Sequence, residues 1–177
     1  MTNAPMTNII LIGFRGTGKS TISTLLAERL GMKRVSTDER ATERCGMSIR
    51  DFVEQHGWAA FRQIEQECIR EAVQEQGIVI DCGGGVVENV ENMRLLSGNG
   101  IVAWVHAELG DVLERLMANE QDAQRPTLTA GMTQAQDITQ NYQRRLPLYE
   151  QYAVLTVNTS MASAEECCRA IISSVSM

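Results

Sequence analysis

Short runs of β-branched and other apolar residues alternate along this chain with segments in which apolar residues recur at helical spacing. Asn8–Ile12 is such a run and ends at Gly13, which is the pattern of a parallel strand buried on both faces. The next segment, Lys19–Leu30, repeats isoleucine and leucine at helical intervals and stops at Gly31. The chain therefore begins with a strand, a glycine loop and a helix.

The same alternation continues to the end of the chain. Further strands are predicted at Lys33–Thr37, Ile78–Cys82, Ile101–Val105 and Ala153–Val157. Further helices are predicted at Ser48–Gln55, Trp58–Gln74, Val90–Leu96, Asp111–Ala118, Gln134–Glu150 and Ala164–Val175. Alternating strands and helices imply a parallel sheet with helices on both faces. The pattern predicts an α/β fold, a three-layer αβα sandwich around a five-stranded parallel sheet.

One segment, Asn119–Thr133, departs from this alternation. It has no hydrophobic periodicity and collects polar residues together with Pro126 and Gly131. Loops of this length are uncommon in compact domains unless they serve a function, such as covering an active site. We expect a mobile loop at residues 119–133.

Composition narrows the class of protein. With 177 residues, of which 44% are hydrophobic, the chain has the size of one globular domain covering residues 1–177. Its net charge of −6 disfavours nucleic acids and membrane surfaces as partners, because both select for basic proteins. Five cysteines, an odd number without metal-ligand spacing, favour reduced thiols in a cytoplasmic protein. We expect a monomer whose partners are small molecules.

The loop after the first strand, Gly13-Phe14-Arg15-Gly16-Thr17-Gly18-Lys19-Ser20, matches the P-loop pattern and lies between a strand and a helix, as that motif requires. Its glycines let backbone amides surround a β-phosphate, and the helix N-terminus adds a positive field. Lys19 would bridge the β- and γ-phosphates of ATP, and Ser20 would bind Mg²⁺. The predicted ATP-binding residues of this region are Gly13, Arg15, Gly16, Thr17, Gly18, Lys19, Ser20 and Thr21.

A P-loop alone does not separate a metabolite kinase from a GTPase. Five further segments, however, follow one another in a recognisable order. They are Val35-Ser36-Thr37-Asp38, Ala60-Phe61-Arg62-Gln63-Ile64-Glu65, Asp81-Cys82-Gly83-Gly84-Gly85, Arg125-Pro126-Thr127-Leu128 and Arg144-Arg145-Leu146-Pro147-Leu148-Tyr149. In these segments and their order, along nearly its whole length, the chain resembles the shikimate kinases, which belong to the nucleoside-monophosphate-kinase-like group with the P-loop NTPase fold.

This resemblance implies an enzyme of aromatic amino-acid biosynthesis that transfers the γ-phosphoryl group of ATP, with Mg²⁺, to the 3-hydroxyl of shikimate. It implies that Asp38 contacts substrate hydroxyls and that Arg62 and Arg145 bind the substrate carboxylate, which suits the guanidinium fork. The substrate would lie against the backbone of the glycine triplet, Gly83, Gly84 and Gly85.

The resemblance also implies two arginines that reach the nucleotide. Arg125, in a lid at residues 119–133, would contact the transferring phosphoryl group, and lid closure would exclude water. Arg115 would lie over the adenine ring. The predicted catalytic residues are thus Lys19, Asp38 and Arg125, and residues 38–66 form the predicted acceptor-binding helical region.

Several of these side chains also have an ordinary structural explanation. Asp38 precedes Glu39-Arg40-Ala41, so a helix N-cap role would explain it equally well without the resemblance. Arg62 and Glu65 have the i,i+3 spacing of a common surface ion pair. An arginine near a helix end, such as Arg115, interacts favourably with the helix dipole.

The sequence departs from the family pattern at the metal site. The family usually carries an acidic residue two positions before the substrate aspartate, where this chain has Ser36. It commonly carries Ser or Thr two positions before the glycine triplet, where this chain has Asp81. We expect Asp81 to supply the missing charge and to hold Mg²⁺ through water together with Ser20. A strand-end aspartate that caps a turn is the alternative.

Three other functions compete with this interpretation. A small GTPase would explain the DxxG pattern at Asp81–Gly84, but Glu120 stands where the guanine motif needs lysine. Another small-metabolite kinase of the same superfamily would share the fold and the phosphate chemistry. A nucleotide-binding regulatory protein with weakened catalysis would explain Ser36.

Overall fold

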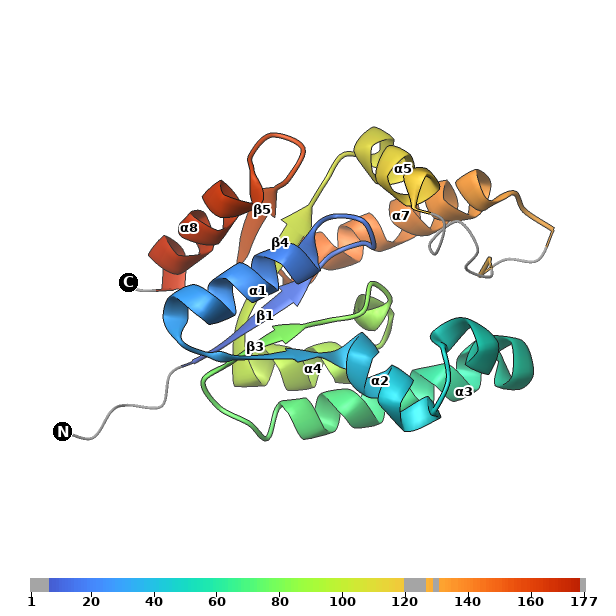
Figure 1. Cartoon of the computed structure of the whole chain (residues 1–177), viewed down its shortest axis with the longest axis horizontal. Helices are drawn as coiled ribbons and strands as arrows, with labels where there is room; N and C mark the ends of the chain where they lie inside the picture. Colours follow the sequence, from blue (N-terminus) through green and yellow to red (C-terminus); the bar gives the residue numbers. More distant parts are fainter. Residues whose placement is uncertain (1–6, 120–126, 129–130, 176–177) are drawn as a thin grey trace.

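Five parallel strands form one sheet in the order β2-β3-β1-β4-β5 (Figure 1). The structure is a computed structural model that describes residues 7–119, 127–128 and 131–175. The strands are β1 (Asn8–Ile12), β2 (Lys33–Ser36), β3 (Ile78–Asp81), β4 (Gly100–His106) and β5 (Leu155–Asn158). The predicted five-stranded parallel sheet is confirmed.

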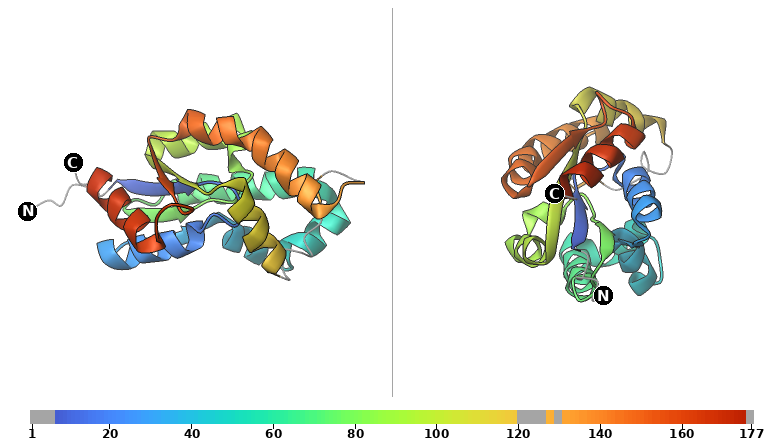
Figure 2. Two further views of the ribbon diagram at one scale, coloured as in Figure 1. Left: turned by 90° about the horizontal axis from the view of Figure 1, so that it is seen from above. Right: turned by 90° about the vertical axis from the view of Figure 1, so that its left-hand side faces the viewer.

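Helices cover both faces of this sheet. They are α1 (Lys19–Leu30), α2 (Thr37–Cys45), α3 (Ile49–Ala72), the 3₁₀ helix η1 (Val86–Glu88), α4 (Val90–Asn99), α5 (Leu109–Ala118), α7 (Gln134–Tyr152) and α8 (Ala164–Val175). Figure 2 shows α1 on one side of the sheet and α4 and α7 on the other. The predicted αβα sandwich is therefore confirmed. Among the described helices, none is long and apolar enough to cross a membrane.

The central strand β1 divides its side chains between the two layers. Ile9 and Leu11 pack with residues of α1 and α8, whereas Ile10 and Ile12 pack with residues of α3, α4 and α7. All four side chains are at most 2% exposed. Side chains alternate between the faces of a strand, so a strand covered on both faces is apolar at every position. This explains the continuous apolar run from which β1 was predicted.

The register of the sheet brings three loops to one edge. Leu11 of β1 and Ser36 of β2 both pair with Asp81 of β3, so these strands end side by side. The amide of Cys82 extends the pairing by donating a hydrogen bond to the Leu11 carbonyl at 3.1 Å. The P-loop, the start of α2 and the glycine triplet consequently leave the sheet together, at the edge where α/β proteins bind ligands.

Helix α2 lies in the predicted helical region at residues 38–66, although the hydrophobic pattern alone did not predict it. Of its nine residues only Thr37 and Ala41 are buried, so it carries almost no apolar periodicity. Ser36 caps the helix by accepting a hydrogen bond from the Glu39 amide at 3.3 Å. The prediction of Thr37 as a strand residue was therefore wrong, and so was the N-cap alternative for Asp38, which lies inside the first turn.

The helices predicted at Ser48–Gln55 and Trp58–Gln74 form one helix, α3, which begins one residue later and ends two residues earlier than predicted. The helix is kinked between them at Gly57, whose φ of 82° and ψ of 165° are not helical. Glycine adopts positive φ without a steric penalty, which allows α3 to change direction there. The kink separates the first turns of α3 from Trp58 and the residues that follow it.

Candidate functional site

The P-loop is curled by its glycines and by hydrogen bonds from its side chains to the Phe14 carbonyl. Gly16 and Gly18 adopt positive φ values of 77° and 91°, which side chains other than glycine rarely tolerate. Thr17 Oγ1 and Lys19 Nζ each donate a hydrogen bond to the Phe14 carbonyl at 2.8 Å. The loop is thus held in a fixed curl at the N-terminus of α1, a site suited to a phosphate group.

A pocket, here called the P-loop pocket, opens over this curl. The predicted ATP-site residues that line it are Arg15, Gly16, Gly18, Lys19, Ser20, Thr21 and Arg115. The other two described residues, Gly13 and Thr17, are buried within the loop. A side chain at Gly13 would overlap the Val105 carbonyl, and Thr17 is 1% exposed. The structure therefore gathers all the described residues predicted for ATP, and it gives Gly13 and Thr17 a supporting position.

Arg115 reaches the P-loop from α5. Its Nη1 donates hydrogen bonds to the Gly16 carbonyl at 3.2 Å and to Thr159 Oγ1 at 3.0 Å, and its Nη2 donates to the Thr159 carbonyl at 3.1 Å. Thr159 Oγ1 in turn donates to the Thr17 carbonyl at 2.8 Å. Arg115 therefore borders the P-loop pocket. Thr159 lies just after β5 and has no signal in the sequence that marks it as part of a site.

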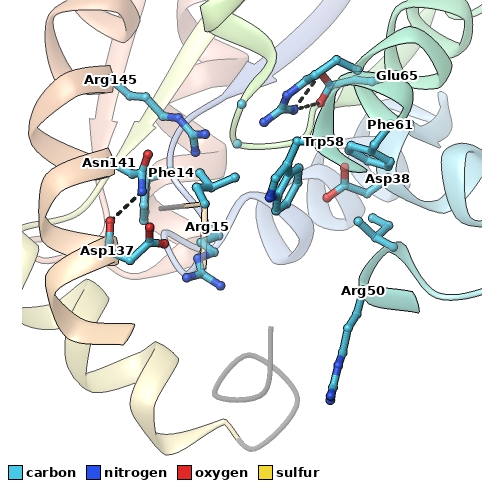
Figure 3. A pocket seen from close by; sticks show the side chains of 15 residues that line it. Phe14, Arg15, Asp38, Arg50, Trp58, Phe61, Glu65, Asp137, Asn141 and Arg145 are labelled. Carbon is cyan, nitrogen blue, oxygen red and sulfur yellow. Dashed lines mark hydrogen bonds and ion pairs between the residues drawn. The ribbon is translucent and has the colours of Figure 1, made fainter. Parts of the chain in front are cut away.

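A second pocket, here called the α3–α7 pocket, lies between these two helices with the P-loop beside it (Figure 3). Its apolar surface is provided by three aromatic rings, those of Phe14, Trp58 and Phe61, together with Ile49 and Leu128. In Figure 3, Arg145 extends from α7 into the pocket, towards the α3 side chains. Its charged and polar lining residues are Arg15, Asp38, Arg50, Arg62, Glu65, Asp137, Asn141 and Arg145.

The aromatic rings also support the two arginines predicted to bind a carboxylate. The Cζ atom of Arg62 lies 5.5 Å from the centre of the Trp58 ring, and that of Arg145 lies 5.7 Å from the centre of the Phe14 ring. Cations over aromatic faces are favourable, especially where water is displaced. The sequence analysis placed Trp58 at the start of a helix but did not assign it to the site. Its position directly after a glycine within a helical region was the local signal.

Asp38 lies at the boundary between the two pockets. Together with Arg15 and Gly84, it lines both of them. A methyl group at Gly83 would overlap Asp38 Oδ1, so the carboxylate rests directly against the glycine triplet. A Cβ atom at Gly84 would lie 3.3 Å from the Arg15 amide nitrogen, so the same triplet also packs against the P-loop. The triplet allows both pockets to share one wall.

Each of the two predicted carboxylate-binding arginines is paired with a glutamate. Arg62 Nη1 donates to both Glu65 oxygens, at 3.0 and 2.9 Å, and Arg145 donates from Nε and Nη2 to Glu88 Oε2, at 3.0 and 2.7 Å. The Glu65 side chain is only 2% exposed, so this i,i+3 pair is not the surface pair considered above. Glu88 was missed, because no motif includes it.

The pKa values of these two glutamates shift in opposite directions. Burial raises the pKa of Glu65, and the charge and hydrogen bond of Arg62 only partly offset this effect. Burial also disfavours the charged form of Glu88, but the charge and hydrogen bonds of Arg145, with the charges of Arg144 and Arg62, outweigh it and hold its pKa below the usual range. Glu88 is therefore a carboxylate at neutral pH.

Asp81 lies beside Ser36, because these residues are paired across β2 and β3. The Asp81 side chain is 5% exposed and accepts hydrogen bonds from Arg34 Nη2 at 2.8 Å and Ser23 Oγ at 3.3 Å. Asp81, Ser36 and Ser20 all line the P-loop pocket. The described residues contain no cluster of three or more acidic, His or Cys side chains that holds a metal by itself. The donors present fit a cation bound mainly by phosphate oxygens, with Ser20 and Asp81 completing its surroundings.

Part of the predicted lid cannot be placed in the site. Arg125 lies outside the described residues, as does most of residues 119–133. Of this segment, Asn119 lines the P-loop pocket and Leu128 lines the α3–α7 pocket.

Comparisons with known proteins agree with this geometry. The family model "Shikimate kinase" matches residues 15–176. A shikimate kinase of Sulfurihydrogenibium is 42% identical over 81% of this chain and 83% of its own length, and one of Caldicellulosiruptor bescii is 36% identical over 95% of both chains. The solved shikimate kinase of Acinetobacter baumannii in complex with shikimate has a TM-score of 0.87 and 27% identity, over 96% of this chain and 93% of its own. This chain belongs to the shikimate kinase family.

Proposed function

We propose that this chain transfers the γ-phosphoryl group of ATP to the 3-hydroxyl of shikimate, giving shikimate 3-phosphate and ADP. The observation that carries this proposal is the place of Asp38, which lines both the P-loop pocket and the α3–α7 pocket. A residue that aligns the acceptor hydroxyl with the γ-phosphorus must lie where the two sites meet. ATP would occupy the P-loop pocket, and shikimate the α3–α7 pocket.

Asp38 would orient the attacking hydroxyl. Its carboxylate would accept the hydroxyl proton late in the reaction, as the oxygen forms its bond to the γ-phosphorus and the bond to the β–γ bridging oxygen breaks. ADP leaves with the electron pair of that bond. The close contact of Asp38 with Gly83 would limit rotation of the carboxylate away from the acceptor hydroxyl.

Arg62 and Arg145 would clamp the shikimate carboxylate from α3 and α7. Arginine pairs with carboxylates through two parallel hydrogen bonds, which fixes the orientation of the acid as well as holding it. The rings of Trp58, Phe61 and Phe14 would cover the apolar part of the acceptor. A clamp at one end of the ring and Asp38 at the other would leave one hydroxyl facing the nucleotide.

Lys19 would neutralise charge on the transferring phosphoryl group, and Arg125 would do so from the lid. Arg115 would lie beside the adenine. Mg²⁺, when bound to ATP near Ser20 and Asp81, supplies further positive charge at the phosphate oxygens. We also propose that the chain acts as a single-domain, cytoplasmic monomer with neither nucleic acid nor membrane as a partner, as its acidic composition suggests.

An acceptor panel tests the proposed reaction. ATP consumption by the purified protein with Mg²⁺ is measured with shikimate, quinate, gluconate, homoserine or nucleoside monophosphates, and without acceptor. We expect strong stimulation by shikimate alone. Stimulation by a different acceptor would replace the substrate but keep the kinase chemistry, and ATP binding without stimulation by any acceptor would favour a regulatory protein instead.

Gly85→Ala tests the clamp by steric means. The backbone of Gly85 has a φ of −91°, which alanine adopts readily, but the added methyl group would overlap the Arg62 guanidinium. Displacing that group should lower kcat/KM for shikimate on the order of 10²-fold, with little change in the KM for ATP. Gly98→Ala is the matched control, because a methyl group there meets nothing within 4 Å. Equal activity of the two variants would contradict the clamp.

Asp81→Asn tests the relocated metal-site charge. Asparagine keeps the size of the side chain and an oxygen for Arg34 and Ser23, but it removes the negative charge. We expect the Mg²⁺ concentration at half-maximal activity to rise about 10-fold or more, as changes in outer metal ligands usually cause. Thermal unfolding without Mg²⁺ should change little by comparison. An unchanged Mg²⁺ dependence would assign Asp81 to the structural network with Arg34 instead.

A further inference from the structure

Glu88 is a carboxylate surrounded by three arginines. It is the last residue of η1, three positions after the glycine triplet. Its Oε1 lies 2.6 Å from Arg144 Nη2, and its Oε2 lies 2.7 Å from Arg145 Nη2 and 3.9 Å from Arg62 Nη2. One side chain thus links both clamp arginines, which come from different helices. None of the sequence motifs above includes this residue.

Arg145 depends on this carboxylate more than a surface arginine would. Its side chain is 6% exposed and its guanidinium lies over the Phe14 ring, so its charge is largely removed from water. A buried charge is costly unless a partner of opposite sign and good geometry offsets the lost hydration. Glu88 supplies that partner by accepting hydrogen bonds from Nε and Nη2 of the same guanidinium.

Glu88 contacts one edge of the Arg145 guanidinium, and this edge determines whether Glu88 supports Arg145 or competes with the acceptor for it. Arg145 lines the α3–α7 pocket, but Glu88 is not among the described residues that line it. The Glu88 carboxylate contacts the Nε–Nη2 edge of the Arg145 guanidinium. The edge formed by Nη1 and Nη2 is the one that a second carboxylate would use for a two-point contact.

The pairing of Arg62 with Glu65 provides a parallel within the same pocket. There too a glutamate binds one part of a guanidinium, and the whole group is stacked near aromatic rings. Each clamp arginine thus has its own glutamate, one from α3 and one from η1. Each glutamate thus limits the directions in which its guanidinium can present hydrogen-bond donors to the pocket.

We propose that Glu88 is a positioning residue for acceptor recognition, which holds the Arg145 guanidinium in the orientation that binds the acceptor carboxylate. This inference rests on the proposed function, because it takes the acceptor carboxylate to be bound by Arg62 and Arg145. Without Glu88, the Arg145 guanidinium would lose the partner that fixes which of its edges faces the pocket.

The test compares shikimate with its carboxamide in steady-state assays of Glu88→Ala and Glu88→Gln. The carboxamide keeps the ring and the hydroxyls but lacks the charge that Arg145 recognises. For Glu88→Ala we expect kcat/KM for shikimate to fall on the order of 10²-fold, while kcat/KM for the carboxamide falls much less and the KM for ATP stays unchanged. Glu88→Gln should lose less, because its amide oxygen still accepts hydrogen bonds from Arg145.

Glu91→Ala is the matched control. Glu91 lies three residues further along the chain and forms an exposed i,i+3 ion pair with Arg94, so this variant removes the same charge outside the site. It should match the unmodified protein with both acceptors. If Glu88→Ala does not fold, as judged by thermal unfolding, Glu88→Gln alone supplies the comparison of the two acceptors.

The alternatives give different results. Equal losses of kcat/KM with shikimate and the carboxamide, which leave the preference between the two acceptors unchanged, would make Glu88 merely structural. Tighter binding of shikimate to the variants would make Glu88 a competitor of the acceptor. Either result overturns the proposal. A protein that does not distinguish the two acceptors before any substitution would refute the carboxylate clamp and with it this proposal, whereas the proposed kinase reaction would fail only if shikimate did not stimulate ATP consumption.

Discussion

The parallel pairing of β1 with β3 is the constraint on which both pockets depend. It ends β1 at the P-loop and β3 at the glycine triplet, next to each other on the same edge of the sheet. The triplet can then pack against the P-loop on one side and against Asp38 on the other, because glycine leaves room for both. The P-loop pocket and the α3–α7 pocket thus share lining residues, among them Asp38 and Gly84.

The second requirement is electrostatic and concerns the arginines of the site. A kinase site for an anionic acceptor needs several arginines in a small, partly apolar volume, yet the chain has a net charge of −6. The structure meets both conditions by pairing arginines with carboxylates locally: Arg62 with Glu65, Arg145 with Glu88, and Arg34 with Asp81. Such pairs are weak sources of stability. Their value here is that each fixes the direction of a guanidinium fork or a carboxylate.

Much of the fold could be predicted from the sequence, because its strongest elements are set by local patterns. The bounds of β1, α1 and α8 agree with the predicted segments residue for residue. Hydrophobic periodicity could not predict helix α2, since Ala41 is its one buried apolar residue and packs in a cluster with residues of α3. Its existence depends on tertiary packing, which periodicity does not record.

The residues of the candidate site could likewise be predicted where a local motif contains them, and not where only the fold brings them together. The P-loop is a contiguous motif, so its residues could be found directly, and the resemblance supplied Asp38, Arg62 and Arg145. Glu88 and Thr159 contact the site only through residues distant in sequence, and nothing local marks them. The exchange of Ser36 and Asp81 was visible as a departure from the family pattern. Only the strand register placed the two residues side by side.

A crystal structure of the protein with ADP, Mg²⁺ and shikimate tests the central claim most directly, since that claim is the division of the site at Asp38. The account predicts the shikimate carboxylate between Arg62 and Arg145, and its 3-hydroxyl within hydrogen-bond distance of Asp38 on the side of the nucleotide. Shikimate bound elsewhere, or bound with its carboxylate turned away from both arginines, would contradict it.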